Sequence, residues 1–255
     1  PLPNTHTTET NTENQQTISV FRTVTNTTEN ITMFEYVCGS VAAEMPLACN
    51  EEALKAQAVA CFTNALRLKA VDENKNDGNI SDDTSVHQGY IDVNQRKEKW
   101  GKDFEKYEKK LQKIVQETEN EALYYNGSVC VAAFSAISNG NTENAQNLWG
   151  TKVNYLVSVD SSADKLSPNY ASTVSYSKDN FFKKAEEAKI PVNKSADIKN
   201  IIKVTKTSET GTVLEVNVNG KSYTGEEIRK AFSLRSPTFT IKATDSSITF
   251  SVHGY

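Results

Sequence analysis

The feature that most constrains the fold of this chain is a pair of helical patterns interrupted by a proline, between Glu35 and Leu68. Before the proline, apolar residues recur at a spacing of three and four, which places them on one face of a helix; they are Phe34, Val37, Cys38, Val41 and Met45. Pro46 disfavours helical geometry at Met45, so the first helix should end near Glu44.

The second helix has its own start signal. Asn50 can cap it, and Glu51 and Glu52 lie in the first turn, where the helix dipole favours negative charge. Its buried stripe is expected to be Ala53, Leu54, Ala58, Cys61, Ala65 and Leu66. The whole segment therefore predicts a helical hairpin.

Glu44 lies on the apolar face of the first helix, because it follows Val41 by three residues and Val37 by seven. A carboxyl group there loses hydration, which favours its protonated form and lets it donate a proton closer to neutral pH. Two interpretations are open: a general acid, or a glutamate that finds a structural partner in a core hairpin. Spacing alone favours the structural partner, since ion pairs and functional carboxyl groups look alike at this level.

The composition argues against a nucleic-acid-binding protein, a bilayer-spanning segment and a zinc ribbon. The 255 residues suffice for one large domain or two modest ones, and the net charge of −4 gives no long-range attraction to nucleic acid or to an anionic membrane. No apolar run approaches the roughly 20 residues that span a bilayer. Because the chain begins at Pro1 rather than Met, we expect a trimmed or processed segment with an anchor upstream. Its four cysteines form no CxxC pair, which excludes zinc-ribbon spacing.

The remaining patterns predict an α+β fold with a mixed, mainly antiparallel sheet, a helical hairpin and a smaller appended α+β lobe. Residues 1–16 lack apolar content and are expected to form a disordered tether. Strands are expected at 17–25, 154–160, 198–206 and 212–218, with hairpins at 122–134 and 238–252; further helices are expected at 96–120, 181–189 and 225–232. The predicted domains are a catalytic core at 17–165, a smaller lobe at 166–233, and a C-terminal hairpin at 234–255 that returns to the core.

Several ordered segments resemble the stage II sporulation protein D family of lytic transglycosylases and the related amidase-enhancer domain. They are EYVCGSVAAEMP at 35–46, EALKAQAVACFTNAL at 52–66, AAFSAISNGNTENAQNLWG at 132–150, YLVSVDSSAD at 155–164, and the run from 201 to 239. Together they cover nearly everything from residue 17 onward. Their order along the chain makes the resemblance specific, although each motif alone is weak.

The resemblance implies that Glu44 is the catalytic glutamate of the AEMP motif. Such an enzyme cleaves the MurNAc–GlcNAc bond of peptide-stripped glycan strands with a single carboxyl group, first as acid and then as base, because the muramoyl 6-hydroxyl is the nucleophile. No metal and no cofactor are expected. The implied partners are peptidoglycan glycan strands, a sporulation amidase–endopeptidase and other engulfment membrane proteins, on the mother-cell side of the engulfing membranes.

The resemblance also implies weaker candidates for substrate binding. Lys55 and Gln57, in the KAQ motif, would face the cleft, although a solvated lysine and a capping glutamine fit as well. A second group occupies a polar, glycine-bearing loop and would bind sugar hydroxyls, or else only shape that loop; it comprises Ser138, Asn139, Gly140, Thr142 and Glu143.

Three departures from the family pattern favour an alternative, a non-catalytic glycan-binding or amidase-activating module, or a structural scaffold. Residues 62–64 read Phe-Thr-Asn where relatives often have Arg-Thr-Tyr, and Ser135-Ala136 replaces a frequent His and Ser. The chain also stops at His253-Gly254-Tyr255, where relatives continue with a glycine-rich run. Of the histidines, His87 is the most interesting, and we interpret it as a turn cap.

Overall fold

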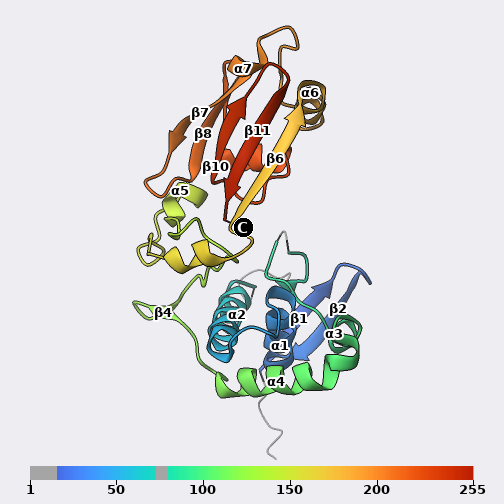
Figure 1. Ribbon diagram of the computed structural model, residues 1–255. Coiled ribbons are helices and arrows are strands. Elements are labelled where there is room, and N and C mark those ends of the chain that lie inside the picture. The colour runs from blue at the N-terminus through green and yellow to red at the C-terminus, as the bar shows by residue number, and fades with distance from the viewer. Residues whose placement is uncertain (1–15, 73–79, 85, 255) are drawn as a thin grey trace, which may run out of the picture. The chain divides into compact units, whose positions relative to one another are not determined.

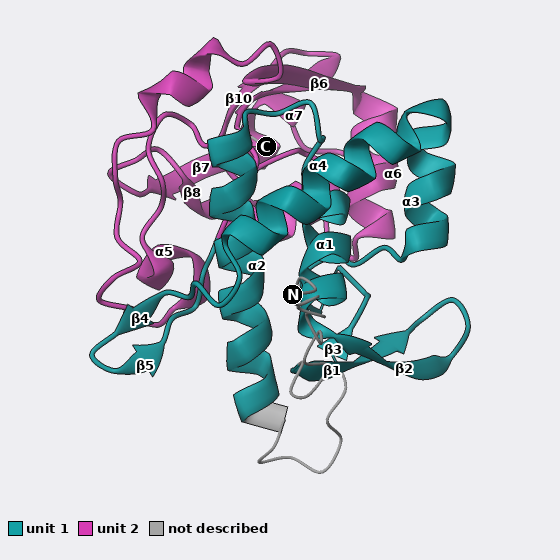
Figure 2. Cartoon of the chain, turned by 90° about the horizontal axis from the view of Figure 1, so that it is seen from below, with its two compact units in different colours: residues 1–133 teal, residues 134–255 magenta. Residues whose placement is uncertain are grey.

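The computed structural model describes residues 16–72, 80–84 and 86–254 (Figure 1). The chain divides into two compact units, residues 1–133 and 134–255, which Figure 2 distinguishes by colour. The expected tether at 1–16 lies outside the described residues except for Gln16. Each unit is described by itself below.

The first unit contains the predicted helical hairpin. Helix α1 spans Met33–Glu44 and helix α2 spans Glu51–Asp72. Thr32 caps α1 by accepting a hydrogen bond from the N–H of Glu35 at 3.1 Å, and Asn50 accepts one from the N–H of Glu52 at 2.9 Å. The second of these caps is the predicted one, and both satisfy backbone donors that a helix start leaves unpaired.

A small sheet and two further helices complete the core of this unit. Strands β1 (Thr17–Arg22) and β2 (Thr27–Thr32) pair antiparallel, and β3 (Ile80–Ser81) adds to β1 in parallel. Helix α3 (Val93–Trp100), a short 3-10 turn (Gly101–Asp103) and helix α4 (Phe104–Glu117) follow, and α4 packs on both α1 and α2 (Figure 1). The fully buried side chains around α1 include Val41, Leu54, Cys61, Leu111 and Ile114.

The chain leaves this core through the predicted Asn-Gly hairpin. Strands β4 (Tyr124–Tyr125) and β5 (Ser128–Val129) are joined by Asn126 and Gly127, whose φ angles of 49° and 78° fit a two-residue turn. The hairpin is held on α2, since Thr63 accepts a hydrogen bond from the N–H of Leu123 at 3.0 Å.

The second unit is built on two antiparallel sheets. One has the order β10-β11-β6, from strands Phe239–Ala243, Ser247–His253 and Ala171–Ser177; the other has the order β7-β8-β9, from Ile202–Thr207, Val213–Val218 and Lys221–Tyr223. Its helical elements are α5 (Ala145–Trp149), a 3-10 turn (Ser162–Leu166), α6 (Lys178–Glu187), α7 (Ile198–Ile201) and α8 (Gly225–Ala231). Stacked rings at its centre, Phe181 on Phe232 and Phe232 on Phe250, form the core.

The predicted fold class, a mixed and mainly antiparallel α+β fold, is confirmed. Three details differ. The helix expected at 96–120 is interrupted at Gly101, whose φ of 50° is incompatible with a continuing helix. The strand expected at 154–160 is absent, and the described residues there make only one bridge, between Asn141 and Asp160.

The third difference concerns the domains. The division falls between residues 133 and 134, whereas the sequence suggested 165 and 166. In the C-terminal hairpin, β11 pairs along its whole length with β6 of the second unit, and Gly254, which follows β11, lies beside the backbone of Ile137 and Ser138. None of the described helices combines the length and the apolarity that crossing a membrane requires.

Candidate active site

Glu44 is the last residue of α1, at the point where the chain turns away from the helix. Met45 is extended, with φ −130° and ψ 145°, and its N–H still donates to the carbonyl of Val41 at 2.9 Å. Pro46 follows, so the predicted end of the helix at the glutamate is confirmed. Glu44 is half-buried, which means that its position on the apolar face removes only part of its hydration.

Two lysines hold the end of α1 and the turn that follows it. Lys99 donates to the carbonyl of Ala42 at 2.7 Å, and Lys110 donates to those of Leu47 and Cys49 at 2.8 and 2.9 Å. Cations at carbonyl groups near a helix C-terminus also oppose the negative end of the dipole. These contacts fix the backbone on both sides of Glu44.

The carboxylate of Glu44 is held by a backbone group from a distant loop. The N–H of Gly89 donates to its Oε1 at 2.7 Å. Gly89 is buried, and a Cβ atom there would lie 3.0 Å from the Cβ of Ala43 and 3.1 Å from Oε1 of Glu44. Glycine thus allows the loop backbone to approach the carboxylate closely enough for this bond.

Two buried side chains lie within electrostatic reach of Glu44. Burial raises the pKa of Tyr36 to about 12, and the charge of Glu44 contributes to the increase. Burial likewise raises the pKa of the Cys61 thiol to about 12, again with a contribution from Glu44. Both groups therefore stay uncharged at physiological pH.

The two candidates on α2 lie on different faces of that helix. Residues two apart in sequence are about 200° apart around a helix axis. Gln57 is buried and donates to Sγ of Cys61 at 3.4 Å. Lys55 instead bridges Glu52 at 3.0 Å and Glu117 of α4 at 2.9 Å. Gln57 thus contacts buried Cys61 within the hairpin, whereas Lys55 lies on the side of α2 that meets Glu117 of α4.

The five loop candidates lie in the second unit, where Glu143 is the centre of a hydrogen-bond cluster. Its Oε2 accepts from the hydroxyl of Ser208 at 2.6 Å and from that of Thr210, while Oε1 accepts from the side chain of Asn147 at 2.9 Å. Burial alone would raise the pKa of Glu143, but these donors, with the N–H of Asn144, lower it to about 2. The glutamate ties its loop to the turn between β7 and β8.

The other loop candidates are also engaged within their own unit. Ser138 binds the N–H of Gly140 at 3.0 Å, and Asn139 donates to the carbonyl of Thr210 at 2.5 Å. The hydroxyl of Thr142 donates to the carbonyl of Val157 at 3.3 Å and accepts from the N–H of Val159 at 3.0 Å. Gly140 has φ +104°, a conformation that favours glycine. These four residues shape the loop.

The interpretation of His87 as a turn cap is confirmed, since its Nδ1 accepts a hydrogen bond from the N–H of Ser81 at 3.0 Å. Among the residues that the structure describes, no group of three or more His, Cys, Asp or Glu side chains is arranged to hold a metal ion. All four cysteines are free thiols.

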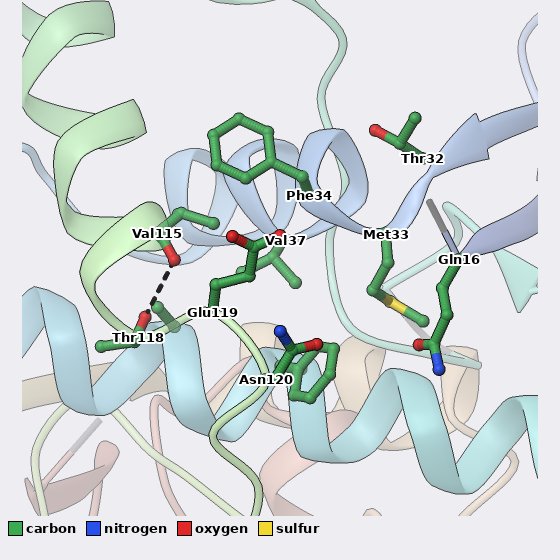
Figure 3. A pocket seen from close by; sticks show the side chains of 11 residues that line it. Gln16, Thr32, Met33, Phe34, Val37, Val115, Thr118, Glu119 and Asn120 are labelled. Atoms are coloured by element: carbon green, nitrogen blue, oxygen red, sulfur yellow. Dashed lines mark hydrogen bonds between the residues drawn. The ribbon is translucent and has the colours of Figure 1, made fainter. Parts of the chain in front are cut away.

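A cavity of about 250 Å³ lies at the opposite end of α1, as Figure 3 shows. Its apolar wall includes Met33, Val37 and Phe62, and its rim includes Glu119 and Asn120. Met33 and Glu44 are the two ends of a 12-residue helix, which separates them by roughly 16 Å along its axis at 1.5 Å per residue. This cavity is therefore distinct from the surroundings of Glu44.

Comparison with known proteins identifies relatives over nearly the whole chain. Residues 22–125 match the family model described as "Stage II sporulation protein". The chain is 35% identical to stage II sporulation protein D of Bacillus amyloliquefaciens over 245 residues, which cover 95% of this chain and 70% of that protein. It is 36% identical to the Bacillus subtilis protein of the same name over 242 residues, covering 93% and 68%. The chain belongs to the stage II sporulation protein D family.

A more distant relative within the comparison is the amidase enhancer of Bacillus subtilis, which is 30% identical over 126 residues. That match covers 49% of this chain and 15% of the enhancer. The resemblance inferred from the motifs, to this family and to the amidase enhancer, is confirmed.

The loop that contacts Glu44, at residues 87–90, could not be identified from the sequence. Gly89 and Gln88 belong to the segment 87–90 that precedes the charged helices, and only His87 of that segment was given an interpretation. The one local signal was a glycine next to an aromatic residue outside any turn pattern, which often marks a close backbone approach.

Proposed function

We propose that this protein is a peptidoglycan lytic transglycosylase that cleaves the MurNAc–GlcNAc bond of glycan strands and releases 1,6-anhydromuramyl ends. The observation that carries the proposal is Glu44 itself: a half-buried carboxylate at the end of α1, in the AEMP motif, with one oxygen held by the N–H of Gly89 at 2.7 Å. Membership of a sporulation protein family supports a role in cell-wall remodelling during sporulation.

The chemistry needs one carboxyl group that acts twice. Protonated Glu44 gives its proton to the glycosidic oxygen as the bond from C1 to that oxygen breaks, and the electron pair of the bond stays with the oxygen. The resulting carboxylate then takes the proton of the muramoyl 6-hydroxyl while O6 bonds to C1. Glycosidases that use water or an enzyme nucleophile need a second carboxylate. Here the substrate provides the nucleophile, so no water is consumed.

The Gly89 contact suits this role because it distinguishes the two carboxyl oxygens. An oxygen that accepts an N–H bond is disfavoured as the site of the proton, so the acid proton would reside on Oε2. No hydrogen bond from the described residues engages Oε2 of Glu44. That oxygen is left for the substrate.

Substrate binding is proposed for the remaining candidates in different ways. Gln57 would contribute beside Cys61, whose thiol lies within electrostatic reach of Glu44, whereas Lys55 would first have to leave Glu52 and Glu117. Ser138, Asn139, Gly140, Thr142 and Glu143 would act through the shape of their loop, because their polar side-chain atoms bind one another and neighbouring segments.

The proposal includes an extracytoplasmic location, with membrane anchoring through an upstream segment on the mother-cell side of the engulfing membranes. Its proposed partners are glycan strands already stripped of stem peptides, a sporulation amidase–endopeptidase that strips them, and other engulfment membrane proteins.

A second candidate function is an amidase-activating or glycan-binding module without lytic activity. The relation to the amidase enhancer over 126 residues favours it. The two functions differ in one property: a lytic enzyme changes the glycan strand, whereas a binding module only retains it.

Digestion of peptide-stripped glycan strands, followed by mass spectrometry, tests the proposal. The wild-type protein should generate anhydromuramyl products, and Glu44→Gln should generate none, because an amide cannot donate the proton. Glu51→Gln is the matched control, since Glu51 is an exposed glutamate in the first turn of α2. Products that persist in Glu44→Gln would contradict the role of Glu44. Strand retention without cleavage by the wild type would favour the binding module.

A further inference from the structure

The segment that presents Gly89 to Glu44 is itself fixed by one side chain. We infer that Gln88 is a positioning residue for Glu44: its amide joins the 87–91 segment to both helices of the hairpin and thereby holds the Gly89 N–H in place. The inference rests on the proposed catalytic role of Glu44 and adds a residue to which neither the family motifs nor the comparisons give a role.

Gln88 uses its whole amide group in this contact. Its Nε2 donates to the hydroxyl of Tyr36 on α1 at 3.2 Å and to the carbonyl of Cys61 on α2 at 3.0 Å. Its Oε1 accepts from the side chain of Asn64 at 3.5 Å. A primary amide offers two donors and an acceptor at a single position. Glutamate offers no donor, and methionine has no group to replace either one.

The partners of Gln88 are buried, which makes these bonds hard to replace with water. Tyr36 and Cys61 both have 0% of their surface exposed. An unpaired polar group in such a place keeps the full cost of its dehydration. The segment is therefore strongly restrained immediately before Gly89.

The segment is restrained on the other side of Gly89 as well. Tyr90 stacks on Tyr36 with ring centroids 5.5 Å apart, and the guanidinium of Arg22 lies 4.9 Å from the Tyr90 ring centre. The N–H of Ile91 donates to the carbonyl of Gly39 at 3.3 Å. With both neighbours fixed, the peptide N–H of Gly89 has one direction, towards Oε1 of Glu44.

Asn64 supports this arrangement from α2. Its side chain pairs with the backbone of Ala132, donating to the carbonyl at 2.9 Å and accepting from the N–H at 3.0 Å. The same amide that bonds Gln88 is thus itself oriented by a second segment. Loss of the Gln88 side chain would release the loop next to the hydrogen bond between Gly89 and Glu44, while Asn64 would keep its bonds to Ala132.

The test measures both the hydrogen bond between Gly89 and Glu44, by NMR and amide exchange, and the effect of its loss on catalysis. In the wild type, the Gly89 amide proton should resonate downfield and exchange slowly, and Glu44→Gln should move that resonance. In Gln88→Met we expect the resonance to move upfield and the exchange to accelerate by at least tenfold. Turnover of glycan strands should fall by about tenfold to a hundredfold with KM nearly unchanged, because a misplaced carboxyl group affects the reaction more than binding.

Gln112→Met is the matched control, because Gln112 is exposed on α4 and makes one side-chain bond, to Glu108 at 3.0 Å. It should leave both readouts as in the wild type. Gln88→Asn, with a shorter reach, replaces Gln88→Met if the latter does not fold, and the same changes are expected. A Gly89 amide that is unchanged in the Gln88 variants would overturn the inference. If that amide changes but the wild type releases no anhydromuramyl product, the positioning of Glu44 stands and the proposed enzyme function fails.

Discussion

The N–H of Gly89 lies 2.7 Å from Oε1 of Glu44, although the two residues are 45 positions apart in the chain. This bond joins the end of α1 to a loop that the helical hairpin does not contain. It gives the carboxylate of Glu44 a fixed orientation, and none of the described residues donates a hydrogen bond to its other oxygen, Oε2. The proposed acid and base is therefore defined by two segments together.

The first prediction concerns Gly89→Ala. The added methyl group would meet the Cβ of Ala43 at 3.0 Å and Oε1 of Glu44 at 3.1 Å, both closer than ordinary contacts. Because the Glu44 carboxylate or the loop must then shift by a few tenths of an ångström, we expect turnover to fall by roughly tenfold to a hundredfold. Stability should fall by about 1–3 kcal/mol, as for overpacking of a buried site. Glycan digestion and urea unfolding measure the two effects. Unchanged turnover would contradict the close approach described here.

The second prediction concerns the buried ion cluster that joins α1, α3 and α4. Arg96 has 0% of its side chain exposed and contacts Glu108 at 2.9 Å and Glu35 at 2.9 Å. Arg96→Leu should cost about 3–5 kcal/mol, because it leaves the buried carboxylate of Glu108 without a counter-charge and with the amide of Gln112 as its remaining side-chain partner. Arg96→Leu combined with Glu108→Leu should be more stable than Arg96→Leu alone.

Equilibrium unfolding of the single and double variants measures this difference. Lys113→Ala is the control, since the exposed Lys113 pairs with Glu51 and Glu117 only at 3.6 Å. Exposed pairs of this kind contribute about 0–1 kcal/mol. A double variant less stable than Arg96→Leu would argue against an unpaired carboxylate as the cause.

The hairpin of α1 and α2 could be predicted from sequence because its signals are local. Periodicity, the Asn50 cap and Pro46 all act within a few residues of one another, and they also fixed the position of Glu44 at the end of α1. The contact with Gly89 could not be predicted. It depends on how a loop crosses α1, which is decided by the stacking of Tyr90 on Tyr36 and by the side chain of Gln88.

The segment 154–160 shows how a correct local pattern can give a wrong element. Its alternation is that of a strand, yet it lacks a partner strand. The N–H groups of Ser158 and Val159 bind the side chains of Asn144 and Thr142, each at 3.0 Å. Val159 remains 56% exposed. The segment is therefore held by side-chain acceptors together with isolated backbone bonds, such as that from the N–H of Thr142 to the carbonyl of Val159, instead of a regular strand ladder. The periodicity of the segment cannot show this, because the partners lie in another loop.

The third prediction concerns the cysteines. Cys38, Cys61 and Cys130 are buried, whereas Cys49 is half-buried. Burial raises the pKa of Cys38 as well as that of Cys61, so the reactive thiolate form of both is scarce near neutral pH. A thiol reagent at pH 8 should modify Cys49 quickly in the native protein and all four thiols in urea. Cys49→Ser should abolish the fast phase. If more than one thiol reacted in the fast phase, the burial of Cys38, Cys61 and Cys130 would be contradicted.

The last prediction concerns acid stability and Glu143. Burial raises its pKa, but hydrogen bonds from Ser208, Thr210 and Asn147 prevail and bring it to about 2, below its ordinary value of 4.5. A carboxyl group whose pKa is lower in the folded than in the unfolded state stabilises the fold fully at any pH above its unfolded-state pKa. That stabilisation is lost as the pH falls towards and through its folded-state pKa. The stabilisation from Glu143 should be complete above pH 4.5 and should fade between pH 4.5 and 2.

Glu143→Gln tests this linkage because it removes the charge and nearly preserves the shape. At pH 7 the variant should be less stable than the wild type by up to about 1.5–3 kcal/mol, the range for hydrogen bonds to a charged group. The difference should shrink steadily below pH 4.5. Glu209→Gln is the control, since Glu209 is exposed on the same turn, and it should show little difference at any pH. Urea unfolding from pH 7 to pH 3 measures both. A deficit for Glu143→Gln that is constant across this range would mean that the carboxylate contributes through its shape and not through its charge.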